Sequence, residues 1–263
     1  MTIRKIESGT IRFQTPASIV PAGFPIKPYE SIQKWVVSRN TKGAIDPIVL
    51  GEFQGGWNAV AYRFCANVEH DASFTASVRE YGVSPAMDQR YRQERELFGF
   101  FVTGLSVLES LAYSTYAIGS MLDATAFPMQ TPKNRKNVDI AETSRRYKKS
   151  FPTENITVVW NELLHLTEFK ELKEVRHILA HRCAPSRRIV DSASISFQTG
   201  ALTDRTVQAE WTAFGIPIDE NTTRTRHDWL VKTVVKILEA TDKFTTSRDL
   251  NSSKQTRGWI SSQ

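Results

Sequence analysis

Apolar residues recur at every third or fourth position over four long stretches of the chain, which is the period of an amphipathic helix. The first of these stretches begins at Trp57 and keeps its period as far as Val68 and beyond. Gly82 ends it, and Ser84 and Pro85 then supply an N-cap and a first-turn proline for the next helix. The pattern predicts a mainly α protein, an antiparallel bundle of helices near residues 57–81, 85–123, 157–183 and 223–244.

The segments between and outside these helices predict three further parts. Residues 1–50 are rich in proline and glycine and predict an extended N-terminal arm with one short helix over residues 31–38. Within the helical domain of residues 51–245, apolar and polar residues alternate over residues 189–213, which predicts a small β-hairpin insertion. Residues 246–263 are rich in Ser, Thr and Lys, and we expect a mobile polar tail there.

The second helix has an unusually apolar second half. Residues 97–122 contain a single charged residue, Glu109, among 26 positions. Their length allows a membrane span, but Gly, Ser, Thr and Tyr dilute the segment, and a carboxylate at its centre is costly in lipid. A helix buried at the centre of a bundle has the same apolar character, and we prefer this interpretation.

The third helix carries an arginine and two histidines close to its end. On a helical wheel Leu172 and Val175 form the stripe that faces the core, and Arg176 lies at the margin of that stripe. His177 and His181, four residues apart, lie on the far side. The histidines are therefore expected to face either solvent or a second subunit.

Residues 176–181 are an arginine, a polar residue, three mostly apolar residues and a histidine. The arginine is Arg176, the polar residue is His177 and the final histidine is His181. This order resembles the signature of the HEPN superfamily, and the resemblance extends loosely over residues 57–245. It implies an antiparallel HEPN-like helical bundle that acts as a metal-independent endoribonuclease, without a cofactor and with RNA as its partner. It also implies a homodimer with a composite active site, which favours the second subunit over solvent. Bacterial toxins and phage-defence effectors are common in the family, and an antitoxin or regulatory protein is a further expected partner.

These residue types can cleave RNA because RNA carries its own nucleophile, the 2′-hydroxyl group. His181 can transfer a proton near neutral pH, Arg176 can hold the scissile phosphate and stabilise developing charge, and His177 can orient the phosphate or share the proton transfer. The resemblance implies a further role for Glu109, which would orient Arg176 across the bundle. The competing interpretation is an exposed glutamate, or an ion pair unrelated to catalysis.

Charge is concentrated just before the third helix. The chain has a net charge of +6 and a pI of about 9.3, which suits an anionic partner. Residues 131–149 contain seven basic and two acidic residues, a local excess of +5. They predict either a phosphate-binding loop or an ordinary solvated loop. The predicted RNA contacts are Lys133, Arg135, Lys136, Arg145, Arg146, Lys148 and Lys149, followed by Arg182, Arg187 and Arg188 beyond the motif.

Three other functions compete with RNA cleavage. His177 and His181 have the spacing of metal ligands, but no third ligand is evident, so we expect no metal. The chain lacks the nucleophile motif of a serine or cysteine hydrolase. Its two cysteines, Cys65 and Cys183, are too few to suggest a disulfide framework. The serious alternative is a non-catalytic HEPN-like module that dimerises or binds RNA. The first residues contain no apolar leader, so a cytoplasmic location is expected.

Overall fold

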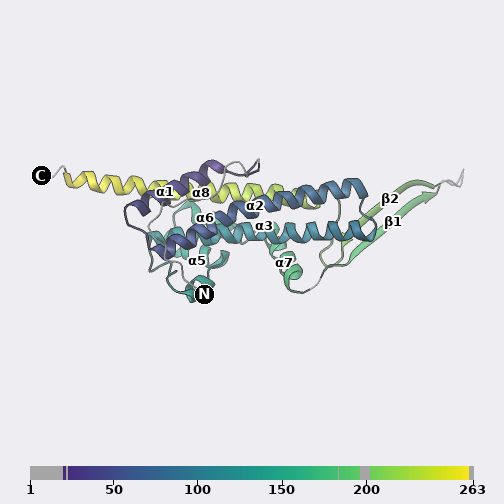
Figure 1. The fold of residues 1–263 in the computed structure, drawn as a ribbon, viewed down its shortest axis with the longest axis horizontal. Helices are drawn as coiled ribbons and strands as arrows, with labels where there is room; N and C mark the ends of the chain where they lie inside the picture. The colour runs from purple at the N-terminus through teal and green to yellow at the C-terminus, as the bar shows by residue number, and fades with distance from the viewer. Residues whose placement is uncertain (1–19, 22, 183, 196–201, 261–263) are drawn as a thin grey trace, which may run out of the picture.

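The computed structural model describes residues 20–260, except residues 22, 183 and 196–201, and it is mainly helical with a small antiparallel sheet (Figure 1). The predicted fold class is therefore confirmed at this level. The helices are α1 (Ile26–Thr41), α2 (Pro47–Tyr81), α3 (Met87–Leu122), α4 (Pro132–Lys136), α5 (Ile140–Ser150), α6 (Asn155–Leu163), α7 (Thr167–His181) and α8 (Asn221–Ile260), and the strands are β1 (Arg187–Ile195), β2 (Leu202–Trp211) and β3 (Ile216–Pro217).

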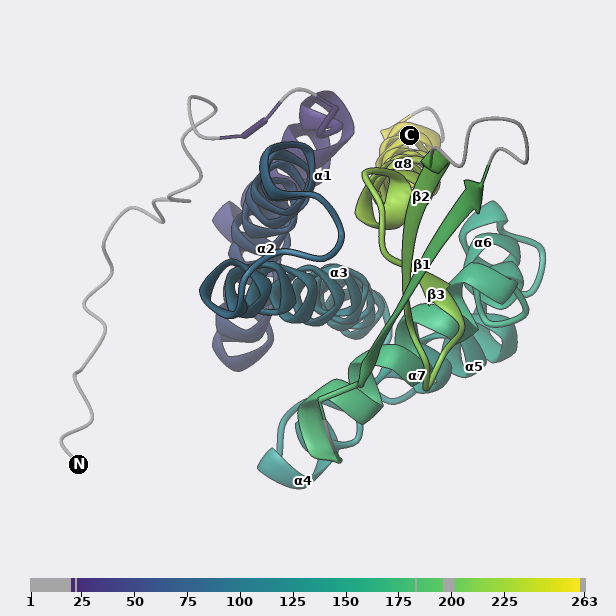
Figure 2. The same cartoon turned by 90° about the vertical axis from the view of Figure 1, so that its right-hand side faces the viewer.

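The long helices α2 and α3 lie side by side and antiparallel, and they form the most extensive contact between any two elements (Figures 1 and 2). Helix α8 packs along both of them, and α1 packs on α8. Helices α5 and α7 pack on α3, and α6 packs between α5 and α8. Strands β1 and β2 project past the end of the bundle at which α2 turns into α3 (Figure 1). Helix α3 therefore contacts α2, α5, α7 and α8 along its length.

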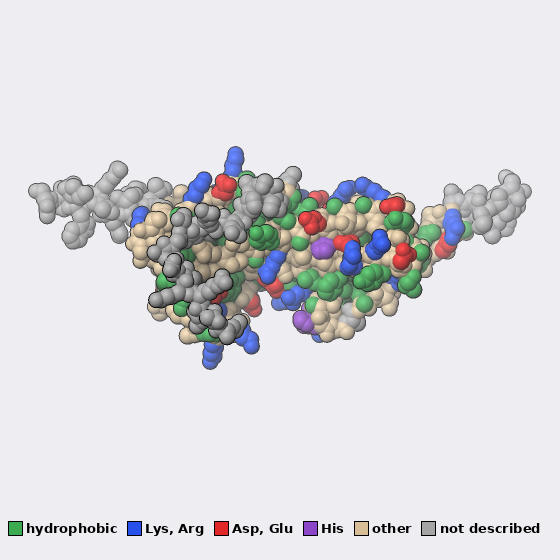
Figure 3. Space-filling model, in the orientation of Figure 1, with side chains coloured by type: hydrophobic (Ala, Val, Ile, Leu, Met, Phe, Trp, Pro, Cys, Tyr) green, Lys and Arg blue, Asp and Glu red, His purple; other side chains and the backbone are tan. Residues whose placement is uncertain are grey.

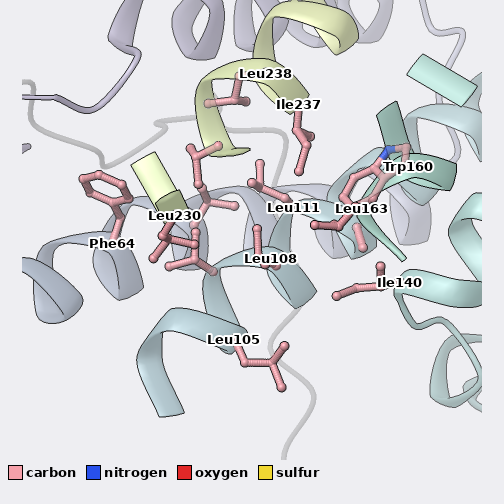
Figure 4. Close-up of a cluster of buried hydrophobic side chains, with 14 of the residues drawn as sticks. Phe64, Leu105, Leu108, Leu111, Ile140, Trp160, Leu163, Leu230, Ile237 and Leu238 are labelled. Atoms are coloured by element: carbon pink, nitrogen blue, oxygen red, sulfur yellow. The ribbon is translucent and has the colours of Figure 1, made fainter. Parts of the chain in front are cut away.

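Side chains from five helices meet in the core, as Figure 4 shows. Phe64 of α2, Leu108 of α3, Ile140 of α5, Trp160 of α6 and Leu230 of α8 are all at most 5% exposed. Burying each such side chain contributes roughly 1.5–3 kcal/mol to folding. The apolar stripes that predict the helices thus also explain how the helices come together.

Helix α3 is the only helix among the described residues that is long and apolar enough to cross a membrane. In the protein, 61% of its most apolar 18-residue window is buried against other helices. That burial is what the central helix of a bundle shows.

Two helices occupy much of the predicted extended arm, so the arm boundary at residue 50 is wrong. Helix α1 is twice as long as the predicted segment 31–38 and buries Tyr29, Ile32 and Trp35. Helix α2 begins at Pro47, where the Asp46 side chain accepts a hydrogen bond from the Ile48 N–H (2.7 Å). Glycines early in α2 interrupt the apolar period, which is why the sequence predicts a start only at residue 57.

The predicted helix over residues 157–183 is two helices, α6 and α7, separated at Leu164–Leu166. Leu163 and Leu172 are nine residues apart, which places them about 180° from each other on one continuous helix. Both side chains are nevertheless buried, at 2% and 6% exposure. The break changes the direction of the chain, so that α6 and α7 each turn their apolar side toward the core.

The predicted hairpin is present as the antiparallel strands β1 and β2, which pair Arg187 with Trp211 and Ile189 with Ala209. The short strand β3 extends the sheet beside the end of β2. Helix α8 continues to Ile260, well past the predicted helix end at residue 244, so the segment expected to be a mobile tail is helical over most of its length.

A buried polar contact joins α2 to α8. Asn67 is fully buried, its Nδ2 donates to the Phe100 carbonyl (2.8 Å), and its Oδ1 lies 3.0 Å from Nδ1 of His227. Burial lowers the pKa of His227, although the nearby Asp71 and Asp228 act in the opposite direction. The folded protein therefore favours the neutral imidazole.

This lowered pKa predicts a loss of stability in mild acid. As the pH falls below about 6.5, the ordinary histidine value, His227 takes up a proton in the unfolded chain before it does so in the folded protein. The stability that the neutral His227 side chain contributes is therefore complete above about pH 6.5 and declines below it. We expect the melting temperature of the wild type to fall more between pH 7.5 and 5.5 than that of His227→Gln. Melting temperatures that fall equally for the two proteins over this pH range would contradict the prediction.

Candidate active site

The motif occupies the last turns of α7, where the helix packs on α3 through Phe169, Leu172 and Val175. His177 and His181 are exposed, and their ring centroids are 5.2 Å apart with the planes tilted by 56°. The two imidazoles thus form one pair on the outer side of α7, as their four-residue spacing predicts.

Arg176 lies on the inner edge of α7 and reaches toward α3. Its Nη2 is 3.9 Å from Oε2 of Glu109, and the side chains are 28% and 40% exposed. The Nε atom of Arg176 is buried without a hydrogen-bond partner among the described residues. The sequence predicts that Glu109 lies beside Arg176, and in the structure the two side chains are neighbours. At 3.9 Å their contact is a loose ion pair. Whether Glu109 orients Arg176 for catalysis stays a prediction.

Glu109 also lies on the wall of a cavity of about 380 Å³ between α2, α3 and the start of α5. Arg63 of α2 lines the same cavity, and its Nη1 donates to the Ser106 carbonyl (3.1 Å) and to Oγ of Ser110. Figure 3 shows the surface hollowed between the parts of the molecule that contain α5 and α7, with basic and acidic side chains beside the hollow. Sequence reasoning missed Arg63, because both of its partners come from α3.

The basic segment over residues 131–149 is not a loop but the helices α4 and α5. Three of its arginines are engaged within the protein. Arg135 is 2.8 Å from Glu52 and also donates to two backbone carbonyls, whereas Arg145 and Arg146 both pair with Glu142. These pairs reduce the positive charge that the segment offers to RNA. The exposed lysines of the segment are Lys133, Lys136, Lys148 and Lys149.

Arg187 was predicted to contact RNA, and the structure contradicts this because its side chain has no exposed surface. Its Nε donates to Oε1 of Glu94 (2.8 Å), and Nη1 donates to Oε1 of Gln93 (2.7 Å). Nη2 lies 2.8 Å from the same Glu94 oxygen, outside hydrogen-bonding geometry. Burial lowers the pKa of Arg187, and the Glu94 carboxylate opposes this shift. The residue holds the hairpin on α3.

The two neighbouring arginines remain accessible. Arg188 is 62% exposed and lies 2.7 Å from Glu210 across the hairpin. Arg182 is exposed and follows the last residue of α7 directly. Both therefore stay candidates for contact with an anionic ligand, and Arg182 is adjacent to His181.

Within the part of the chain that the structure describes, no three His, Cys, Asp or Glu side chains gather in a group that could hold a metal ion. The pair of His177 and His181 thus stands without a third ligand among those residues. No protein-family model, curated protein sequence or solved structure matches the chain.

Proposed function

We propose that this protein is a metal-independent endoribonuclease of the HEPN type, with Arg176, His177 and His181 as its catalytic residues. The observation that carries the proposal is the division of these side chains on α7. The arginine is held on the inner edge beside Glu109, and the two imidazoles stand exposed one turn apart. A cation on the same helix as accessible proton-transfer groups suits phosphodiester cleavage.

In the proposed reaction, His181 removes the proton from the 2′-hydroxyl group of the ribose. The O2′ atom forms a bond to phosphorus, the bond from phosphorus to O5′ breaks, and the departing oxygen takes up a proton. The products are a 2′,3′-cyclic phosphate and a 5′-hydroxyl end. Arg176 stabilises the charge on the phosphate oxygens in the transition state, and His177 orients the phosphate or supplies the second proton transfer.

A homodimer belongs to this proposal, because a single α7 offers its histidines to open surroundings rather than to a closed site. A two-fold axis near the end of α7 would bring two copies of the motif together. The two chains would then share one groove in which water is excluded and charges act more strongly.

RNA would reach this groove over the basic surface that remains exposed. The side chains available for phosphate contacts are Lys133, Lys136, Lys148, Lys149, Arg182 and Arg188. Such contacts carry no base specificity, so they suit a nuclease that acts on many RNAs. An activity of this kind harms the cell that makes it, so a toxin or phage-defence role, with a partner protein that blocks the groove, completes the proposal.

The test is the cleavage of an unstructured RNA by the purified protein in the presence of EDTA. We expect products with a 5′-hydroxyl end, which polynucleotide kinase labels without prior phosphatase treatment, and with a 2′,3′-cyclic phosphate at the other end. Binding of the RNA without cleavage would favour the alternative, a non-catalytic module that dimerises or binds RNA. A requirement for added metal would contradict the mechanism.

A further inference from the structure

Small residues of α2 line the cavity beside Glu109. Gly55 and Ala59 of α2 form a floor of backbone and small side chains, whereas the space beside Gly56 is filled by Tyr113 and Ser114 of α3. Its volume of about 380 Å³ is within the range of small-molecule sites, roughly 300–1,000 Å³. Such a floor gives a flat group close access to the helix.

Tyr113 of α3 forms one wall of this cavity and is held in place. Its hydroxyl donates to Oε2 of Glu52 (2.7 Å), and Glu52 in turn pairs with Arg135. Burial, together with the Glu52 carboxylate, raises the pKa of Tyr113, so the phenol stays neutral and keeps its hydrogen bond. An aromatic ring in a fixed position is a surface on which a base can stack.

Arg63 stands at the opposite end of the floor. One of its terminal nitrogens is bound to the Ser106 carbonyl and to Ser110, which fixes the guanidinium group. The residue is exposed, so the other N–H groups of its planar fork are available to a ligand. This geometry suits bidentate binding of a phosphate group.

We propose that this cavity is a nucleotide subsite for single-stranded RNA. The base lies on the floor of Gly55 and Ala59 beside Tyr113, and its phosphate is bound by Arg63. Glu109 lines the cavity and lies 3.9 Å from Arg176, which places the arginine of the motif beside this subsite. The subsite thus fixes the position of the strand relative to the scissile bond. This inference rests on the proposed nuclease function.

Two glycines of α2 make a matched test. A Cβ atom added at Gly55 or at Gly51 meets no other atom within 4 Å, so a larger side chain at either position begins in open space. Both glycines are exposed in the same helix, one turn apart, and only Gly55 lines the cavity. Leucine favours a helix over glycine by about 1 kcal/mol, so neither variant should lose stability.

The probe is a fluorescein-labelled, mixed-sequence 16-nucleotide RNA, with affinity measured by anisotropy. Gly55→Leu should weaken binding about tenfold or more because the side chain fills the floor, whereas Gly51→Leu should bind as wild type does. Arg63→Gln should weaken binding and lower the salt dependence by about one phosphate contact. Melting curves by circular dichroism establish that each variant is folded.

The outcomes separate the subsite from the nuclease. If wild type binds and cleaves RNA but Gly55→Leu and Gly51→Leu bind equally well, the subsite is wrong and the nuclease stands. If wild type binds RNA without cleavage and only Gly55→Leu loses affinity, the subsite stands and the nuclease function is wrong. If wild type neither binds nor cleaves RNA, both proposals are wrong.

Discussion

His181→Ala is expected to slow RNA cleavage by about a hundredfold or more and to leave RNA affinity nearly unchanged. The imidazole is exposed and forms no part of the core, so its loss removes a proton-transfer group without disturbing the fold. General acid or base catalysis contributes roughly 10²–10⁴-fold to a rate. The measurement is the single-turnover cleavage rate at saturating protein, which separates the chemical step from binding.

His165→Ala is the matched control, because His165 is also exposed and lies in the break just before α7, outside the motif. It should cleave RNA at the wild-type rate. Arg176→Ala should lower both affinity and rate, since its cation serves the bound phosphate and the transition state. Equal rates for His181→Ala and wild type would show that the motif is not catalytic, and the binding-module interpretation would then be the better one.

Local periodicity was sufficient to predict the main elements. The positions of α3 and of the hairpin, and the exposure of His177 and His181, all follow from a period of 3.6 or of 2. These features depend on residues that are close in the sequence. The break between α6 and α7 cannot be predicted from neighbouring residues, because it depends on how Leu163 and Leu172 each reach the core.

Charge in the sequence was a poorer guide, because it does not reveal which side chains pair in space. Arg135 lies in a run of basic residues, but its carboxylate partner, Glu52, is 83 positions earlier in α2. Tyr147, in the same basic run, is fully buried, and its hydroxyl donates to the Thr115 carbonyl (2.7 Å). Such pairings become visible only once the helices are packed.

Arg187→Met should lower the free energy of unfolding by about 3 kcal/mol, the lower end of the range for breaking a buried ion pair. The lower end applies because Glu94 is 28% exposed and water can partly solvate its carboxylate. Removing Arg187 also leaves the Gln93 amide without this partner inside the protein. In a domain of this size the change corresponds to a melting temperature roughly 6–12 °C lower. Thermal and urea unfolding measure it.

The neighbouring Arg188→Met is the control, since Arg188 pairs with Glu210 on the exposed side of the hairpin and should contribute less than about 1 kcal/mol. RNA affinity, measured at a temperature where both variants are folded, distinguishes structure from binding. A phosphate contact at Arg187 would give a large loss of affinity and a small loss of stability. A guanidinium group buried against Glu94 would instead give a large loss of stability and a small loss of affinity. Equal melting temperatures for the two variants would contradict the proposed role of Arg187 in holding the hairpin on α3.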